Sequence, residues 1–203
     1  MRNLCSCGIM FHHFYGGTHP KFQGAINADD FVAILNFVGH DNILNGDEWI
    51  ELAKSRELPD NKFCLTFDDT LKSQIDIALP ILKDFGIKSI WFPYTSVLEG
   101  ELAKLELYRY FRNNFFGTMD DFYDAFRESM SQWIGYEKVK LKLQNVDTSK
   151  YLKDFPFYSA GDRWFRYVRD QCIESTEYDF LMDKLIGQFD FDKQAIAKLL
   201  WMK

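Results

Sequence analysis

The chain has 203 residues, enough to bury one hydrophobic core, so a single domain is the default expectation. Hydrophobic residues make up 47% of it, which is typical of a globular protein, and its formal net charge of −6 argues against nucleic acid and anionic membranes as partners. The sequence has neither an apolar run of membrane-spanning length nor the apolar core of a signal peptide, which predicts a cytoplasmic protein.

The first half of the chain alternates predicted strands and helices. Strands are expected at residues 9–14, 42–44, 62–67 and 88–94, and helices at 28–38, 46–55 and 71–85. Asn27 and Asp30 form a capping-box pair at the start of the first helix, and Pro80 is expected to kink or split the third. Strands that alternate with helices indicate a parallel sheet or a (β/α) barrel.

The pattern changes after residue 96, and the remainder shows no clear strand. Helices are expected at residues 99–116, 118–133, 159–168, 176–186 and 193–202, with a loop at 144–158. Thr118 and Ser159 are the expected N-caps of two of these helices, each followed three residues later by an aspartate. The sequence therefore predicts an α/β half, residues 1–96, and a helical insertion or subdomain, residues 97–203.

Two adjacent acids, Asp68 and Asp69, directly follow the strand expected at 62–67. Neighbouring residues of a strand point to opposite faces, so one of the two carboxylates is expected to be directed into the fold. Burying a carboxylate without a partner is costly, and a bound metal ion or a role in proton transfer would account for it. The alternative is that the aspartates cap the helix that begins near Leu71, and the pattern alone does not decide between the two interpretations.

The run Leu65–Asp69 (LTFDD) resembles the first motif of the polysaccharide deacetylase (NodB-homology) family, usually written TFDDG. Residues 9–14 (IMFHHF) are similar to that family's first strand, where an aromatic residue is often followed by histidine, and residues 24–31 (GAINADDF) resemble the helix start after it. The resemblance covers about residues 8–95. Thr70 stands where the family usually has glycine, a departure expected to crowd the site.

The resemblance implies a partial (β/α) barrel of the polysaccharide deacetylase type, with about four parallel strands, followed by a mostly helical insertion. The family removes N-acetyl, and sometimes O-acetyl, groups from sugars with the help of a divalent metal ion, here expected to be zinc. By the same resemblance Asp68 is the catalytic base and Asp69 is a metal ligand. His12 either contacts the substrate or orients the metal ligands without binding the metal itself. A hydrogen-bonded structural role is the alternative for His12.

The ligand set that the resemblance implies is incomplete in this sequence. The family's other two ligands are histidines of an H-[ST]-x-x-H motif that follows the aspartates, whereas all four histidines here precede Asp68 and no two are four residues apart. We therefore expect a truncated enzyme whose remaining strands and histidines lie beyond Lys203. Negligible deacetylase activity is expected from these 203 residues alone.

The expected function is that of a metal-dependent carbohydrate deacetylase-like hydrolase, which cleaves non-peptide carbon–nitrogen bonds in the acetylated sugars of a surface polysaccharide or its precursor. The expected partners are acetylated carbohydrate and either a second copy of the chain or a complementing C-terminal fragment. A non-catalytic binding or assembly protein that retains a half barrel is the alternative. A third possibility is a different metal-dependent reaction with ligands supplied by another subunit.

Overall fold

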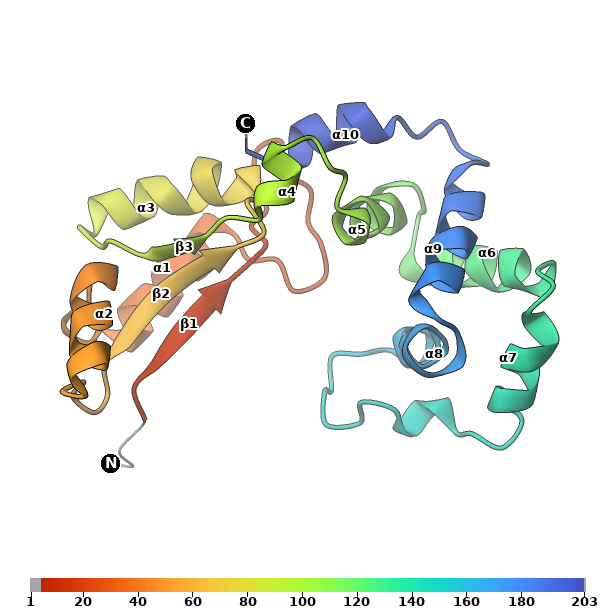
Figure 1. Cartoon of the computed structure of the whole chain (residues 1–203), viewed down its shortest axis with the longest axis horizontal. Helices are drawn as coiled ribbons and strands as arrows, with labels where there is room; N and C mark the ends of the chain where they lie inside the picture. Colours follow the sequence, from red (N-terminus) through yellow and green to blue (C-terminus); the bar gives the residue numbers. More distant parts are fainter. Residues whose placement is uncertain (1–4, 203) are drawn as a thin grey trace. The chain divides into compact units, whose positions relative to one another are not determined.

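A computed structural model describes residues 5–202 and divides the chain into two units (Figure 1). The first unit consists of Met1–Ala103 together with Lys193–Lys203, and the second consists of Lys104–Asp192. The last helix, expected in the helical half, is thus grouped with the α/β unit. Residues 1–4, part of the segment on which the expectation about a signal peptide was based, lie outside the described residues, as does residue 203. None of the helices within 5–202 combines the length and the apolar character that crossing a membrane requires.

The first unit contains a three-stranded parallel sheet with the order β1-β2-β3. Its strands are β1 (Cys7–Phe11), β2 (Phe63–Asp68) and β3 (Ile90–Phe92). The expected α/β arrangement with parallel strands is therefore present, but with three strands in place of about four.

The segment expected to be the additional strand, residues 42–44, forms the end of a 3-10 turn (His40–Asn42) followed by a single parallel bridge between Ile43 and Phe63. The backbone of this segment is committed to local hydrogen bonds, because the amide of Asn42 donates to the carbonyl of Gly39 and that of Ile43 donates to His40. The segment therefore has too few free backbone groups to form a continuous strand paired with β2.

All helices of the first unit except α4, which was not expected from the sequence, lie close to their expected positions. The helices of this unit are α1 (Ala28–Val38), α2 (Gly46–Ser55), a π-helical segment (Gln74–Ala78), α3 (Leu79–Asp84), α4 (Thr95–Leu98) and α10 (Lys193–Leu200). The capping box of Asn27 and Asp30 at the start of α1 is confirmed. The helix expected at 71–85 is helical from Lys72 to Asp84 and contains a π-helical turn directly before Pro80, which has no N–H to donate and lies in the first turn of α3.

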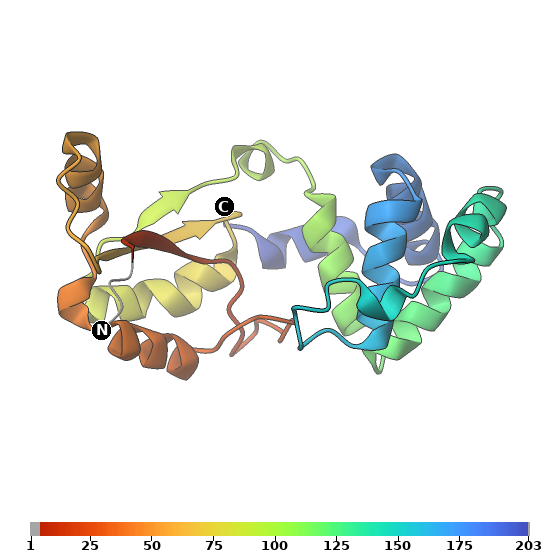
Figure 2. The ribbon, with the colours of Figure 1, turned by 90° about the horizontal axis from the view of Figure 1, so that it is seen from below.

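One face of the sheet carries the hydrophobic core of the first unit. Phe11 of β1 and Phe67 of β2 pack there with Phe31 of α1 and Leu82 of α3, and Figure 2 shows both helices on the same side of the strands. The ring of Phe67 also stacks on that of Trp91, with centroids 4.4 Å apart. This burial determines which residues of each strand are left for the opposite face.

The second unit is entirely helical. It consists of α5 (Lys104–Asn114), α6 (Met119–Ser131), α7 (Tyr136–Leu143), a 3-10 turn (Thr148–Lys150), α8 (Ala160–Tyr167), a π-helical segment (Val168–Cys172) and α9 (Ser175–Ile186). The capping boxes that begin at Thr118 and Ser159 are confirmed. Helix α7 was not expected from the sequence, because only Val139 of its eight residues is buried and no apolar stripe reveals it.

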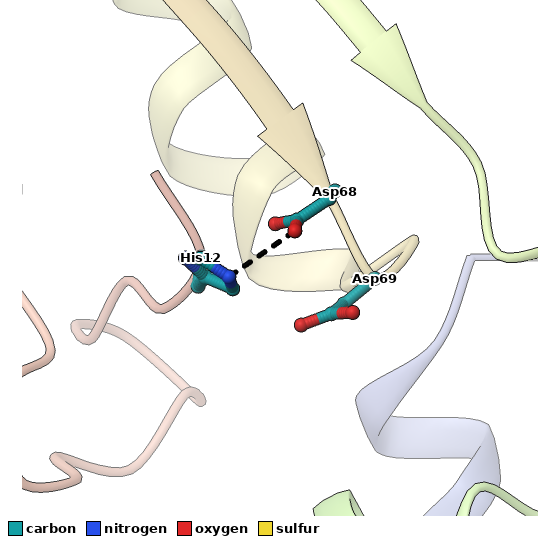
Figure 3. Close-up of side chains that lie close together, drawn as sticks. All are labelled: His12, Asp68 and Asp69. Atoms are coloured by element: carbon teal, nitrogen blue, oxygen red, sulfur yellow. Dashed lines mark ion pairs between the residues drawn. The ribbon is translucent and has the colours of Figure 1, made fainter. Parts of the chain in front are cut away.

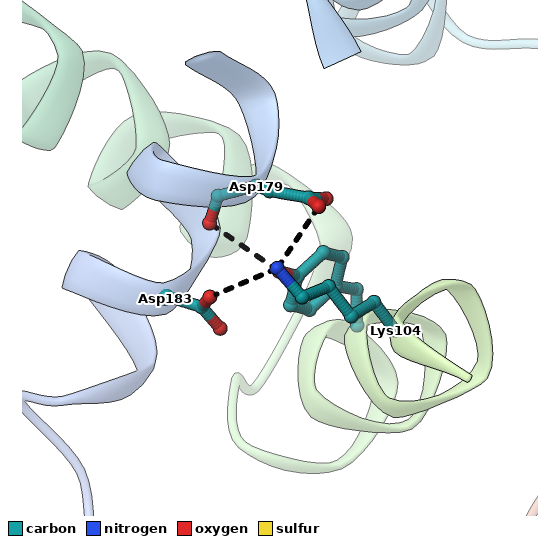
Figure 4. A network of polar contacts seen from close by, with 4 residues as sticks. Lys104, Asp179 and Asp183 are labelled. Atoms are coloured by element: carbon teal, nitrogen blue, oxygen red, sulfur yellow. Dashed lines mark hydrogen bonds and ion pairs between the residues drawn. The ribbon is translucent and has the colours of Figure 1, made fainter. Parts of the chain in front are cut away.

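Aromatic side chains form most of the core of the second unit. Phe111, Phe122, Phe126 and Phe165, from three different helices, are fully buried there. At the surface Lys104 joins α5 to α9, with its Nζ 3.0 Å from Asp179 Oδ2 and 3.5 Å from Asp183 Oδ2 (Figure 4). Because these charges are partly exposed to solvent, the ion pairs contribute little beside the aromatic core.

A buried polar pair links α6 to α8 within that core. The hydroxyl of Tyr123 donates to Asp162 Oδ1 at 2.5 Å, and the two residues are 1% and 7% exposed. Burial alone raises the pKa of Asp162, but hydrogen bonds donated by Tyr123 and by Ser159 outweigh it, so the net shift is downward. The contribution of Asp162 to stability is therefore present above its unfolded pKa of about 4 and is lost as the pH falls through the lower, folded value.

We expect the substitution Tyr123→Phe to lower the free energy of unfolding by about 1.5–3 kcal/mol at pH 7, because it removes a hydrogen bond to a buried carboxylate. The difference from the wild type narrows as the pH falls from about 4, the unfolded pKa, through the lower pKa of the folded carboxyl group. Urea unfolding at several pH values measures both effects. Tyr158→Phe is the control, since no described residue accepts a hydrogen bond from the Tyr158 hydroxyl. A pH-independent loss in Tyr123→Phe would contradict the assignment.

Candidate metal and catalytic site

The carboxyl ends of β1 and β2 bring His12 and Asp68 together. The register pairs Phe11 with Phe67, so the residues that follow them, His12 and Asp68, are next to each other across the two chains. Side chains alternate between the faces of a sheet, and Phe11 and Phe67 occupy the core face. His12 and Asp68 therefore lie on the opposite face.

The side chains of His12, Asp68 and Asp69 form one compact group (Figure 3). His12 Nε2 lies 3.1 Å from Asp68 Oδ2, and one ligand atom from each of the three residues lies within 4.8 Å of the others. The side chains of His12 and Asp68 are 42% and 24% exposed, so the group is accessible but not fully solvated. The three residues singled out from the sequence are thus neighbours in space.

The backbone at Asp69 explains how two adjacent acids reach the same place. Asp69 has φ = 65° and the next residue, Thr70, has φ = 57°, so both adopt the left-handed conformation. The expected alternation holds only for extended backbone and ends at Asp68, the last residue of β2. The left-handed turn brings the second carboxylate back beside the first, instead of sending the two to opposite faces.

The capping interpretation of these aspartates does not fit the structure. The helical backbone after β2 begins at Lys72, so Leu71, and neither aspartate, stands in the N-cap position. Asp68 Oδ1 is instead a buried acceptor without a hydrogen-bond partner among residues 5–202. An unsatisfied buried carboxylate oxygen beside a second carboxylate and an imidazole suits a cation, and this donor set is one that zinc and similar divalent metals accept.

The other three histidines have separate surroundings. His19 Nε2 lies 2.9 Å from Asp76 Oδ2, and His40 Nε2 lies 2.9 Å from the carbonyl oxygen of Phe85. The ring of His13 lies parallel to that of His12, with centroids 6.1 Å apart. Within residues 5–202 no second histidine joins the group of His12, Asp68 and Asp69.

Gln74 and Tyr94 also lie near the group, and of these Gln74 was not assigned a role from the sequence. Gln74 is fully buried, and its side-chain amide donates to the backbone carbonyls of His12 and Asp68. Tyr94, 46% exposed, follows β3, and its backbone amide donates to the Thr70 hydroxyl at 2.5 Å. A buried glutamine six residues after an acidic motif has no sequence signature, because an isolated amide in a helix is usually exposed.

Thr70 is held by its neighbours in a conformation that favours glycine. A β-branched residue with positive φ is strained by about 1–3 kcal/mol. Its hydroxyl accepts the hydrogen bond from Tyr94, and its carbonyl oxygen accepts one from the amide of Met202 at 3.0 Å. The hydroxyl thus ties the turn after β2 to the end of β3, which compensates for the strain.

No protein-family model and no curated protein sequence matches this chain. Among solved structures, it is similar to a de-N-acetylase from Aggregatibacter actinomycetemcomitans, with a TM-score of 0.35 and 15% identity over 49% of this chain and 40% of that chain. It is also similar to the deacetylase PplD of Streptococcus pyogenes, solved in complex with acetate, with a TM-score of 0.39 and 24% identity over 50% of this chain and 47% of that chain. The match spans less than half of each of these two chains.

We expect Thr70→Val to lower the free energy of unfolding by about 1–3 kcal/mol, because it keeps the branched side chain in a strained conformation and leaves the Tyr94 amide without its acceptor. Thr70→Ser retains the hydroxyl and should lose less. Thermal unfolding of the two variants and the wild type measures the difference. A Thr70→Val variant that is as stable as the wild type, with a loss in Thr70→Ser alone, would show that the methyl group, and not the hydroxyl, stabilises the turn.

Proposed function

We propose that this chain carries part of the active site of a metal-dependent carbohydrate deacetylase, a hydrolase that releases acetate from acetylated sugars. The observation that carries the proposal is the convergence of His12, Asp68 and Asp69 at the carboxyl ends of two adjacent parallel strands, where sites of α/β proteins usually lie. The resemblance of Leu65–Asp69 to the deacetylase motif is the basis for assigning these residues to metal binding and proton transfer.

In this proposal Asp69 and His12 would hold a divalent cation, with zinc as the first candidate. Both side chains offer ligand atoms within the compact group, and neutral imidazole and carboxylate are ordinary zinc ligands. A bound cation of this kind supplies polarisation of the acetyl carbonyl and lowers the pKa of a bound water. One histidine and one carboxylate are fewer ligands than the three of a typical catalytic zinc site, so binding by these residues alone is expected to be weak.

Asp68 is assigned the role of general base. Its Oδ2 lies 3.1 Å from His12 Nε2, so the proposed base stands directly beside one of the proposed metal ligands, where it could accept a proton from a water that the cation binds. The proton then has to reach the leaving amine, and the acid that delivers it is not among the residues that converge here. A partial (β/α) barrel, an acetylated surface polysaccharide or its precursor as substrate, and a cytoplasmic location complete the proposal, and they rest on the motif resemblance and the sequence.

The proposal predicts that the purified chain binds one zinc ion at a site that contains Asp69. We expect Asp69→Ala to raise the zinc dissociation constant about tenfold or more, because it removes a metal ligand and not merely a group that hydrogen-bonds to one. Isothermal titration calorimetry with zinc, checked by metal analysis of the dialysed protein, makes the measurement. Asp84→Ala is the matched control, since it removes an exposed carboxylate at the end of α3.

Wild-type protein that binds no zinc, or binds it equally well without Asp69, would contradict the proposed metal site. A non-catalytic binding or assembly function would then be the better interpretation.

The separate roles of the two aspartates lead to a second prediction. Asp68→Asn keeps the size of the side chain but removes a proton acceptor, so we expect it to leave zinc binding within about threefold of the wild type, far less than loss of a ligand costs. Acetate release from N-acetylated chito-oligosaccharides, followed by an enzyme-coupled assay, is expected to be negligible in both proteins. Acetate release that Asp68→Asn abolishes would show that the described residues already form a working site.

A further inference from the structure

Gln74 connects the backbones of the two strands at the candidate site. It is fully buried, and its Nε2 donates to the carbonyl oxygen of His12 at 2.9 Å and to that of Asp68 at 2.6 Å. A glutamine amide has two N–H donors, so each carbonyl receives one of them. These are the carbonyls of the same two residues whose side chains lie 3.1 Å apart in the site.

The orientation of the Gln74 amide follows from its surroundings. If the amide were rotated by 180°, its oxygen would face two carbonyl oxygens at hydrogen-bond distance, which is repulsive. The present orientation leaves Gln74 Oε1 buried and without a hydrogen-bond partner among residues 5–202. Donation to both carbonyls is therefore the interaction that places this amide, even though its own acceptor goes unsatisfied.

The two hydrogen bonds take the place of a missing step in the sheet. The ladder between β1 and β2 ends with the pair Phe11 and Phe67. His12 and Asp68 would be the next pair, but the chain after β1 leaves the sheet. The Gln74 amide bridges the two carbonyls there, so the strands stay at a defined separation one residue beyond the end of their own pairing.

The backbone of Gln74 is itself anchored from both sides. Its amide donates to the carbonyl of Leu71, and its carbonyl accepts from the amide of Leu79, which closes the π-helical turn before Pro80. Single π-helical turns inside helices are frequent at functional sites. The position from which the Gln74 side chain reaches the two strands is thus fixed by the helix.

We propose that Gln74 is a positioning residue: by holding the carbonyls of His12 and Asp68 together, it sets the separation at which the His12 imidazole and the Asp69 carboxylate can hold one cation next to the Asp68 carboxylate. This inference rests on the metal-dependent function proposed above. Gln74 does not contact the cation or the substrate in this scheme. It acts on the peptide groups from which the side chains of the site project.

The bridge itself can be tested without any metal. In protein labelled with 15N and 13C, scalar couplings through hydrogen bonds are expected from the Gln74 side-chain nitrogen to the carbonyl carbons of both His12 and Asp68. Slow hydrogen exchange of the same amide protons should accompany them. Absence of both couplings, with rapid exchange, would overturn the inference.

The effect on the site is tested by Gln74→Met, which keeps an unbranched side chain of similar length and removes both donors. We expect the zinc dissociation constant to rise about tenfold or more, as for other groups that orient ligands, and the visible spectrum of the cobalt-substituted site to change. Leu82→Ala is the control for general destabilisation. It creates a cavity in the hydrophobic core of the first unit, and Leu82 takes no part in the hydrogen bonds of Gln74. It should lower the unfolding temperature while zinc affinity and the cobalt spectrum stay unchanged.

Wild-type affinity and spectrum in Gln74→Met, or equal weakening in both variants, would overturn the inference. If wild-type protein binds no zinc or cobalt, the proposed function fails and the positioning role fails with it. Couplings observed in that case would still show that the bridge exists as a structural element. The two failures are therefore distinguishable.

Discussion

The burial of Phe11 and Phe67 against Phe31 is the constraint on which the candidate site depends. It commits alternate residues of β1 and β2 to the core face and leaves the intervening residues for the other face. Because the register is set by this packing, His12 and Asp68 emerge side by side. A slip of one residue in either strand would move its polar side chain to the core face, so the same apolar contacts that stabilise the unit also specify the site.

The turn after β2 adds the second carboxylate at a local cost. Asp69 and Thr70 both have positive φ, and neither is a glycine. Strained backbone of this kind persists where the surroundings hold it in place, and it is concentrated at functional sites. Here the surroundings are the Thr70 hydrogen bonds to the segment after β3 and to the segment after α10, together with the Gln74 bridge. Two carboxylates on one side of the sheet are the result.

Local signals in the sequence predicted local structure well. The capping boxes that begin at Asn27, Thr118 and Ser159 are formed as expected, because each depends on residues three positions apart. The strand expected at 42–44 and the unexpected helix α7 depend on competition between local turns and packing, which periodicity alone does not resolve. The contacts of Gln74 span 62 residues to His12, and the sequence offers no pattern from which such a bridge is predicted.

The electrostatics of the group indicate what it is suited to bind. Two carboxylates with oxygens within 4.8 Å repel each other by about 3–4 kcal/mol at an effective dielectric constant of 20. One imidazole contact at Asp68 Oδ2 leaves Oδ1 buried and unsatisfied, so His12 alone does not compensate for placing the two acids together. A divalent cation held by His12 and Asp69 would offset the repulsion between the two carboxylates. Zinc affinity is therefore the property that tests the proposed site most directly.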